Sequence, residues 1–442
     1  MDHLYVINNS YKMLLITLTC SAGNLGPSPG TVANVFPWLI TVGATTIDRD
    51  FEVDVVLGTG KVIKGGANNA SSNSVSGSLD VDIEVNGTIV ICESFYQCIT
   101  LIDDEGAFGG IIISNASRQK PIDFGAYTIA AVSVEDGARI LSYINSTSNP
   151  LATILPTRVI PKYYKPAPVV ADFSSRGPIP SIRNLLKPDI VAPGVGIIGA
   201  WRLNDTNLEI DPDEEITHFR ILSGTSQACP HVSGLVAMVK SRHPTWSPSA
   251  IKSAIMTTAI NQDNLHAPIT TINNGSNATP YDIGAGEISI NGPLSPGLIY
   301  ETHITDYVQF LCNIGCNAST IKTIASIVPS NFSCHSNSTD LISDMNYPSI
   351  TVSAKEPRTV KRTVTNVGEV NSTYKAIVEA PAGVQVQVVP KTLSFTKNVT
   401  KLSFRVKFSV PPTNTSEGAL FGSITWSNGK YKVRSPFVVS NV

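Results

Sequence analysis

The sequence is poor in charge, and this narrows the kind of protein it can be. Charged residues make up 15% of its 442 residues, against roughly 25% in an average soluble protein. The net charge is −2 and the isoelectric point is near 6.4, so the sequence lacks the basic footprint of a nucleic-acid-binding protein. No stretch reaches the ~18 apolar residues of a membrane span. We therefore expect neither nucleic acid nor a membrane as a partner.

The rest of the composition is that of a globular protein. Hydrophobic residues make up 42% of the chain, enough for real cores. The length exceeds what one core usually accommodates, which predicts several domains. The glycines of "GAFGG" come before an apolar run, whereas a phosphate-binding loop follows a strand. They are better explained as tight turns, and we expect no cofactor and no metal.

Sequons for N-glycosylation are frequent. The pattern N-x-S/T occurs fourteen times, and a sequon is an acceptor only in a chain that enters the secretory pathway. We therefore interpret the protein as secreted. The sequons that we expect to be glycosylated include Asn115, Asn204, Asn277, Asn371 and Asn398.

The amino-terminal region allows two interpretations. In "YKMLLITLTCSAG", Lys12, a short apolar run and small residues follow one another, as they do in a signal peptide. The same run, Leu14 to Cys20, also fits a buried strand that enters a glycine turn. Because the run is short and does not begin at the amino terminus, we expect the buried strand.

The first half of the chain alternates between strand and helix signals. A strand is expected from Leu39 to Ala44, and "GGANNASSNSVSGSLD" then indicates a loop. Apolar strands introduced by glycine alternate with helical stretches up to about residue 160, including a helix near Ile99 to Glu105. We predict a small α/β module over residues 51–160.

The pattern changes again toward the carboxyl terminus. From Val169 to about Tyr300 it is α/β with long helices, one of which has Ser247 as N-cap and Pro248 at its first position. From about residue 341, short strands with period-two alternation are separated by Pro, Gly and Asn. Asn428-Gly429 between two such runs is a strong hairpin signal. This spacing predicts a β-sandwich.

One short stretch contains a candidate nucleophile. "ILSGTSQACPHVSGLVAMVK" reads as a loop that delivers Ser226 to the start of a helix, with Gly224 allowing a tight turn. The first N–H groups and the dipole of that helix would point at whatever Ser226 attacks. Pro230 would fall at the end of the first turn, where a missing N–H removes little helical bonding. A nucleophile fits this pattern, and so does a serine that merely caps a core helix.

Four ordered blocks resemble the subtilisin family of serine proteases. They are "SAGNLGPSPGTVANVFPWLITVGA", "ADFSSRGP", "LLKPDIVAPGVGIIGAW" and "SGTSQACPHVSG". The last block implies that Ser226 is the nucleophile, and the first implies that Asn24 lies in the oxyanion hole. The arrangement is that of plant subtilases (S8 family). "TPYDIGAGEISINGPLSPGLIYET" and "LFGSITWSNGKYKVRSPFVV" resemble in particular the CO2-response secreted protease group. The resemblance covers nearly all residues from Thr19 onward.

The resemblance also implies a domain arrangement. It implies an α/β fold with a partial subtilisin-like parallel sheet and helices on both faces, a protease-associated insert domain and a C-terminal fibronectin-III-like β-sandwich. The implied boundaries are 1–50 for the oxyanion part of the catalytic domain, 51–160 for the insert, 161–340 for the nucleophile part and 341–442 for the sandwich. Peptide or protein substrates, an extracellular location in the apoplast or cell wall and a homodimer formed through the insert are further implications.

The base that a serine nucleophile needs is missing. The family takes its His from an H-G-T-H block and its Asp from a D-[ST]-G block, both before the oxyanion segment. The histidines of this chain are His3, His218, His231, His243, His266, His303 and His335. None lies in such a block; only His3 precedes Asn24, and His231 would lie on the helix body. Asp172 and Asp189 belong to other family blocks. The triad Asp and His are therefore absent from this chain.

The resemblance also suggests roles for the cysteines. Cys312 and Cys334 match the pair that flanks the family's post-catalytic loop, and they are the expected disulfide. The other predictions are a second candidate pair, Cys92 with Cys98, and two buried thiols, Cys20 and Cys229.

Two functions remain open. The first is the carboxy-terminal part of a secreted serine endopeptidase that hydrolyses peptide bonds and is inactive without its triad Asp and His. The second is a non-catalytic secreted glycoprotein that binds peptides or partner subtilases through the insert and the sandwich. Soluble secretion of the 442-residue chain would favour the second, and an upstream H-G-T-H block would favour the first.

Overall fold

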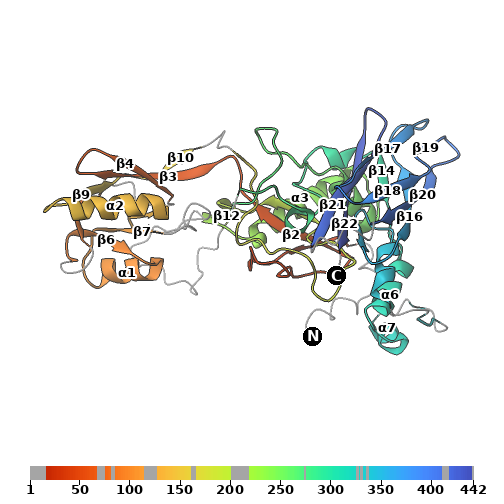
Figure 1. Ribbon diagram of the computed structural model, residues 1–442, viewed down its shortest axis with the longest axis horizontal. Helices are drawn as coiled ribbons and strands as arrows, with labels where there is room; N and C mark the ends of the chain where they lie inside the picture. The colour runs from red at the N-terminus through yellow and green to blue at the C-terminus, as the bar shows by residue number, and fades with distance from the viewer. Residues whose placement is uncertain are drawn as a thin grey trace.

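The structure is a computed structural model that describes most of the chain. The described residues are 16–66, 75–80, 85–113, 127–160, 166–200, 219–272, 275–324, 328, 332–334, 338–410 and 418–440. Three separate hydrophobic cores belong to an α/β part, a module of about residues 50–160, and a C-terminal β-sandwich. In Figure 1 the module and the sandwich lie at opposite ends of an elongated molecule, with the α/β part between them.

A short parallel sheet forms the centre of the α/β part. Its strands are β1 (Leu18–Ser21), β2 (Leu39–Thr45) and β11 (Ile190–Pro193), in the order β1-β2-β11. Helix α3 (Thr225–Arg242) packs against all three strands, and α4 (Pro248–Thr257) packs against α3. The middle strand, β2, is wholly buried, as in other covered parallel sheets. β1 is only half-buried, and among the described strands it pairs with β2 alone.

The strand and helix predictions in this part are close to the structure. The expected buried strand Leu14 to Cys20 falls partly outside the described residues, and its described portion overlaps β1; the expected burial was wrong, because β1 lies at the edge of the described sheet and is only half-buried. α4 begins as its sequence indicates, because the Ser247 hydroxyl accepts a hydrogen bond from the Ala250 N–H and Pro248 is the first helical residue. The remaining elements of this part are β12 (Ile197–Ala200), β13 (Phe219–Leu222), α5 (Pro280–Ile283), the 3₁₀ turn η3 (Gly292–Leu294), α6 (Ile304–Asn313), α7 (Ala318–Ile324) and the 3₁₀ turn η4 (Thr339–Asp344).

The module is a closed sheet with two helices packed against it. Its strands are β3 (Asp50–Leu57), β4 (Val62–Gly66), β5 (Val75–Asp80), β6 (Thr88–Cys92), β7 (Gly109–Ile113), β8 (Ile129–Val132), β9 (Leu151–Ile154) and β10 (Arg158–Ile160). The order is β10-β3-β4-β8-β7-β6-β5-β9, and β9 pairs with β3 to close the sheet. The helices are α1 (Phe95–Asp103) and α2 (Val134–Ser146). α1 begins before the expected Ile99, because the Ser94 hydroxyl caps it by accepting from the Gln97 N–H.

The C-terminal part is a sandwich of two sheets. One has the order β14-β16-β20-β18 and the other β15-β22-β21-β17-β19. The strands are β14 (Leu298–Tyr300), β15 (Ile350–Ser353), β16 (Arg358–Asn366), β17 (Thr373–Glu379), β18 (Gln385–Val389), β19 (Thr392–Ser394), β20 (Lys401–Ser409), β21 (Ala419–Ser427) and β22 (Lys432–Ser440). Trp426 and Phe404 meet edge to face inside the core. The hairpin expected at Asn428-Gly429 joins β21 to β22, and Asn428 Oδ1 accepts from two N–H groups of the loop.

A buried ionic cluster ties β11, β2 and α4 together. Asp189 Oδ2 lies 2.6 Å from Lys187 Nζ and 3.3 Å from Lys252 Nζ, and it accepts from the Thr41 N–H at 2.8 Å. Tyr347 donates its hydroxyl proton to the other carboxylate oxygen. Burial alone would raise the pKa of Asp189, but the two lysines outweigh burial and hold it below its ordinary value. The carboxylate is fully engaged here, so Asp189 has a structural role.

Candidate active site

Ser226 is the second residue of α3, and its side chain is exposed. The helix starts where the chain leaves β13, and the Gly224 N–H donates to the Gly194 carbonyl at 2.8 Å, just beyond β11. A Cβ on Gly194 would lie 2.7 Å from the Gly224 oxygen and 2.7 Å from the Ala44 Cβ, so no larger residue fits there. The close contact between these two glycines places the start of α3 at the carboxyl end of the parallel sheet.

The prediction for Pro230 was wrong in detail. α3 begins at Thr225, so Pro230 is its sixth residue rather than the end of the first turn. The N–H that proline lacks is the one that would donate to the Ser226 carbonyl. The turn that follows Ser226 therefore loses one helical hydrogen bond.

Asn24 lies in the turn after β1 and reaches the start of α3. Its Oδ1 accepts from the Thr225 N–H and from the Thr225 hydroxyl, both at 2.9 Å. Because a backbone N–H can only donate, this contact identifies the oxygen of the amide and leaves its NH₂ free to act elsewhere. The Gly23 N–H also donates to Thr225 Oγ1, at 3.2 Å. Asn24 thus satisfies one of the four unpaired N–H groups at the helix start.

The free NH₂ of Asn24 and the backbone N–H of Ser226 lie near each other, beside Gly224. A Cβ placed on Gly224 would lie 2.7 Å from Gln227 Oε1, 3.5 Å from Asn24 Nδ2 and 3.7 Å from the Ser226 nitrogen. Neither donor has an acceptor among the described residues. An oxyanion hole needs free donors close to the nucleophile, and here two such donors lie near Gly224 together with the side-chain oxygen of Gln227. The helix dipole adds partial positive charge at the same place.

The "ADFSSRGP" block holds the Asn24 turn, a role that the sequence did not reveal. Ser175 donates its N–H to the Gly23 carbonyl at 2.9 Å, and its hydroxyl oxygen accepts from the Leu25 N–H at 3.1 Å. The Gly26 N–H donates to the Phe173 carbonyl, and a Cβ on Gly26 would lie 2.1 Å from the Ser174 oxygen. The turn is therefore fixed from both sides. The serine pair Ser174-Ser175 and Gly26 were the sequence features that could have indicated this contact.

No base reaches Ser226 within the described residues. The Ser226 hydroxyl has no hydrogen-bond partner there, and His231 is exposed on the helix body with Nδ1 3.0 Å from the Gln227 carbonyl oxygen. His243 stacks on Trp246, with Nε2 2.9 Å from the Leu294 carbonyl oxygen. The remaining described histidines, His266 and His303, make no hydrogen bond to Ser226 either, and His3, His218 and His335 lie outside the described residues.

The other predicted sites are distributed as follows. The sulfurs of Cys312 and Cys334 are bonded in the structure, and so are those of Cys92 and Cys98, which join β6 to α1. Three of the predicted glycosylation sites are exposed, and two lie outside the described residues; the exposed ones are Asn277, Asn371 and Asn398, and the others are Asn115 and Asn204. Among the described residues, no cluster of His, Cys, Asp or Glu could hold a metal ion, and no helix has the length and apolarity to cross a membrane.

The expectation of buried thiols needs correction. Cys20 on β1 and Cys229 on α3 are only partly buried, since β1 is an edge strand in the described residues. Burial raises the pKa of the Cys20 thiol, and the neighbouring Cys229 raises it further. The Cys20 thiol is therefore a poor nucleophile at neutral pH.

Comparison with models of known protein families shows which family the chain matches. Residues 5–286 match the model of the subtilase family of peptidases, and residues 344–439 match a fibronectin type-III domain. The chain belongs to the subtilase family. The expected α/β fold with a C-terminal fibronectin-III sandwich is confirmed.

Curated relatives from Arabidopsis thaliana agree with this assignment. The CO(2)-response secreted protease is 45% identical over 463 residues, which cover 96% of this chain and 59% of that protein. Subtilisin-like protease SBT5.1 is 44% identical over 96% of this chain and 60% of its own length. Subtilisin-like protease SBT1.6 is 39% identical over 97% and 60%. The chain thus spans less than two thirds of each of these relatives.

Proposed function

We propose that this chain is the nucleophile-bearing part of a secreted serine endopeptidase. Ser226 attacks the carbonyl carbon of the scissile peptide bond, and the Asn24 NH₂ together with the Ser226 N–H stabilises the oxyanion that forms. The observation that carries the proposal is that these two unpaired donors lie near Gly224, next to an exposed serine at a helix start.

A histidine base and an aspartate must come from outside these 442 residues. No histidine in the described part of the chain contacts Ser226, and none in the whole sequence lies in a family block for the base. A serine hydroxyl without a base is a weak nucleophile. The chain alone is therefore inactive as a triad protease.

Two surfaces of the α/β part suit the element that would carry the base. β1 has an open side in the described residues, where a further parallel strand can pair. The face of α3 turned away from the sheet exposes small residues, among them Gly234 and Ala237, while the exposed Ser233 is hydrogen-bonded to Thr19 at the edge strand β1. Small side chains let another backbone approach closely. Both surfaces adjoin Ser226, so a segment that covers them is also placed to reach the nucleophile.

The test supplies the missing residues. The propeptide and the Asp- and His-bearing part of a related plant subtilase are fused ahead of Thr19, and peptide hydrolysis is measured on secreted, folded chimera. Activity should vanish with Ser226→Ala. Asn24→Asp keeps the oxygen that accepts from Thr225 but replaces the NH₂ donor, so kcat should fall at least roughly 100- to 1000-fold, as when an oxyanion-hole donor is removed. A folded chimera without activity would reject the proposal.

The second function has one observation in its favour. Each of the three parts has its own hydrophobic core in this chain, so a stable non-catalytic protein is physically reasonable. In that case the chain would be a secreted glycoprotein that binds peptides or partner subtilases through the module and the sandwich. It would be secreted in soluble form on its own, and the chimera would remain inactive.

Location and assembly follow the family. We infer that the module of about residues 50–160 is a protease-associated insert and that the protein acts outside the cell, in the apoplast or cell wall. A relative is named as a secreted protease, and the exposed sequons agree with glycosylation. A homodimer through the insert would show as a doubled mass in light scattering, and deletion of the insert would abolish it.

A further inference from the structure

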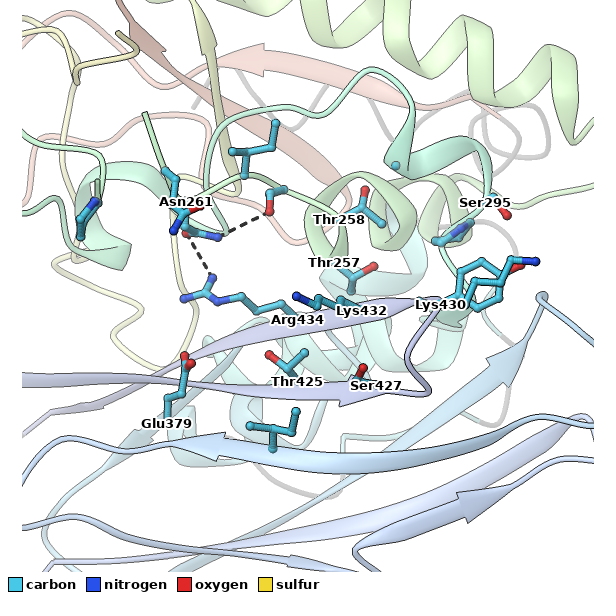
Figure 2. Close-up of a pocket in the computed structure, with 18 residues that line it drawn as sticks. Thr257, Thr258, Asn261, Ser295, Glu379, Thr425, Ser427, Lys430, Lys432 and Arg434 are labelled. Carbon is cyan, nitrogen blue, oxygen red and sulfur yellow. Dashed lines mark hydrogen bonds between the residues drawn. The ribbon is translucent and has the colours of Figure 1, made fainter. Parts of the chain in front are cut away.

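A wide groove separates the sandwich from the α/β part, and neither Ser226 nor Asn24 lines it. Its volume is about 870 Å³. One wall is the chain that follows α4, from Thr257 to Gln262, together with Ser295 and Pro296. The other is the outer face of strands β17, β21 and β22. Figure 2 shows side chains from both walls directed into the space between them.

The strand register determines which side chains of the sandwich wall lie next to one another. Arg434 on β22 lies opposite Thr425 on β21, which lies opposite Ile377 on β17. Lys432 lies opposite Ser427 in the neighbouring row. Residues two apart on one strand share a face and are separated by about 7 Å. The two cations therefore stand in line along the groove, beside a row of hydroxyl groups (Figure 2).

Arg434 is held in place with part of its hydrogen-bonding capacity free. Its Nη1 donates to Asn261 Oδ1 at 3.3 Å and to the Ala285 carbonyl at 3.2 Å, both on the α/β part. The other guanidinium nitrogens have no acceptor among the described residues. An arginine fixed at one nitrogen presents its remaining donors in a defined direction. Such a fixed fork suits a carboxylate.

The other charges leave the groove positive. Lys432 is exposed, and no described residue accepts from its Nζ. Lys430 also lines the groove but is paired with Glu369 at 2.5 Å. The carboxylate of the lining, Glu379, accepts from the Ser423 hydroxyl at 2.7 Å. Two cations, Lys432 and Arg434, are thus available to an anionic ligand.

The lining also restricts what kind of anion fits. Lysine and arginine side chains can only donate hydrogen bonds, and a carboxylate can only accept them. The lining has three lysine or arginine residues and one carboxylate, Glu379. The remaining polar residues of the lining are hydroxyl and amide groups, which both donate and accept, among them Thr258, Gln262 and Ser427. A ligand that combines carboxylates with hydroxyl groups matches both kinds of lining group, and the exposed Ile377 offers apolar surface to sugar rings.

We propose that this groove binds a carboxylated oligosaccharide, with Arg434 and Lys432 as the carboxylate contacts. The site is independent of Ser226 and of a base, so binding requires no peptidase activity. It would hold the protein on an acidic polysaccharide through the sandwich.

The test uses the whole 442-residue chain and a decamer of unesterified galacturonate as the probe. Binding is measured by calorimetry at low and high salt. We expect saturable binding that weakens as salt rises, since the contacts are ionic. The double variant Lys432→Gln/Arg434→Gln should weaken binding by at least about tenfold, because it removes both charged hydrogen-bond donors to the carboxylates.

The matched control removes the same charge elsewhere. Arg405 and Lys407 stand two apart on β20, on the outer face of the other sheet, and both are exposed. Arg405→Gln/Lys407→Gln should leave binding within about twofold of the unsubstituted chain. Near-equal losses in both double variants would show only general charge attraction and would overturn the proposal. So would failure to bind the decamer, or binding of a deca-glutamate peptide at least as tight as that of the sugar. A melting temperature for each variant confirms that it is folded.

Discussion

Glu287 offers a test of the buried core that supports the site. It lies between Val191 on β11 and Ile260, and it is buried with one side-chain partner, the Thr45 hydroxyl, which donates to Oε2 at 2.8 Å. Burial raises its pKa from 4.5 to about 8, and the Thr45 hydrogen bond offsets this only in part. The carboxyl group is therefore protonated in the folded protein at neutral pH.

The consequence for stability has a definite sign. Between pH 4.5 and about 8 the folded state holds a proton that the unfolded state has lost, so stability falls as pH rises through this window. The contribution is fully present below pH 4.5 and is lost above about 8. At about 1.4 kcal/mol per pH unit, raising the pH from about 5.5 to about 7.5 should remove roughly 3 kcal/mol.

Glu287→Gln isolates this effect. Glutamine has nearly the same shape and keeps an oxygen to accept from Thr45, but it does not titrate. The free energy of unfolding in denaturant is measured for both proteins across the pH window, and their difference should change by roughly 3 kcal/mol in favour of the variant as the pH rises. Exposed Glu356 provides the control as Glu356→Gln. If the difference in the free energy of unfolding between Glu287→Gln and the unsubstituted chain stays constant with pH, Glu287 does not hold a proton in the folded state, and the reasoning is wrong.

Three further changes test other parts of the structure. Cys312→Ser with Cys334→Ser opens a loop of sequence separation 22 and should lower the free energy of unfolding by about 3 kcal/mol; an unchanged denaturation midpoint would contradict this. Asn24→Ala removes the acceptor for the Thr225 N–H and should cost about 1 kcal/mol, whereas Asn24→Asp keeps it; equal melting temperatures for the two variants would argue against the cap. Gly26→Ala places a Cβ 2.1 Å from the Ser174 oxygen and should destabilise by at least about 1–3 kcal/mol, as overpacking does; a melting temperature unchanged by this substitution would contradict the close packing of the turn.

The fold could be predicted from the sequence where local signals are strong. Ser247 with Pro248 marked the start of α4, and Asn428-Gly429 marked the β21–β22 hairpin. The start of α1 was misplaced, because the Ser94 hydroxyl that caps the helix was overlooked as a start signal. Local chemistry thus specified several element boundaries, but not all of them.

The site was less accessible to sequence reasoning. Ser226 and Asn24 could be singled out through the resemblance, but not the contact between Asn24 and Thr225, which are 201 positions apart. Ser175 was overlooked because its hydroxyl and N–H act on a turn 150 residues earlier. Such contacts depend on how the parallel strands bring distant loops together. The cationic groove has the same origin, since its walls come from different parts of the chain.

The most direct test of the central claim is peptide hydrolysis with and without an added base. The 442-residue chain, its Ser226→Ala variant and the chimera that carries the Asp and His of a related subtilase are assayed on the same fluorogenic peptides. We predict that the chain alone turns over no faster than Ser226→Ala, and that the chimera turns over in a Ser226-dependent manner. Turnover by the chain alone that disappears with Ser226→Ala would contradict the account, because it would show that a base is already present in this sequence.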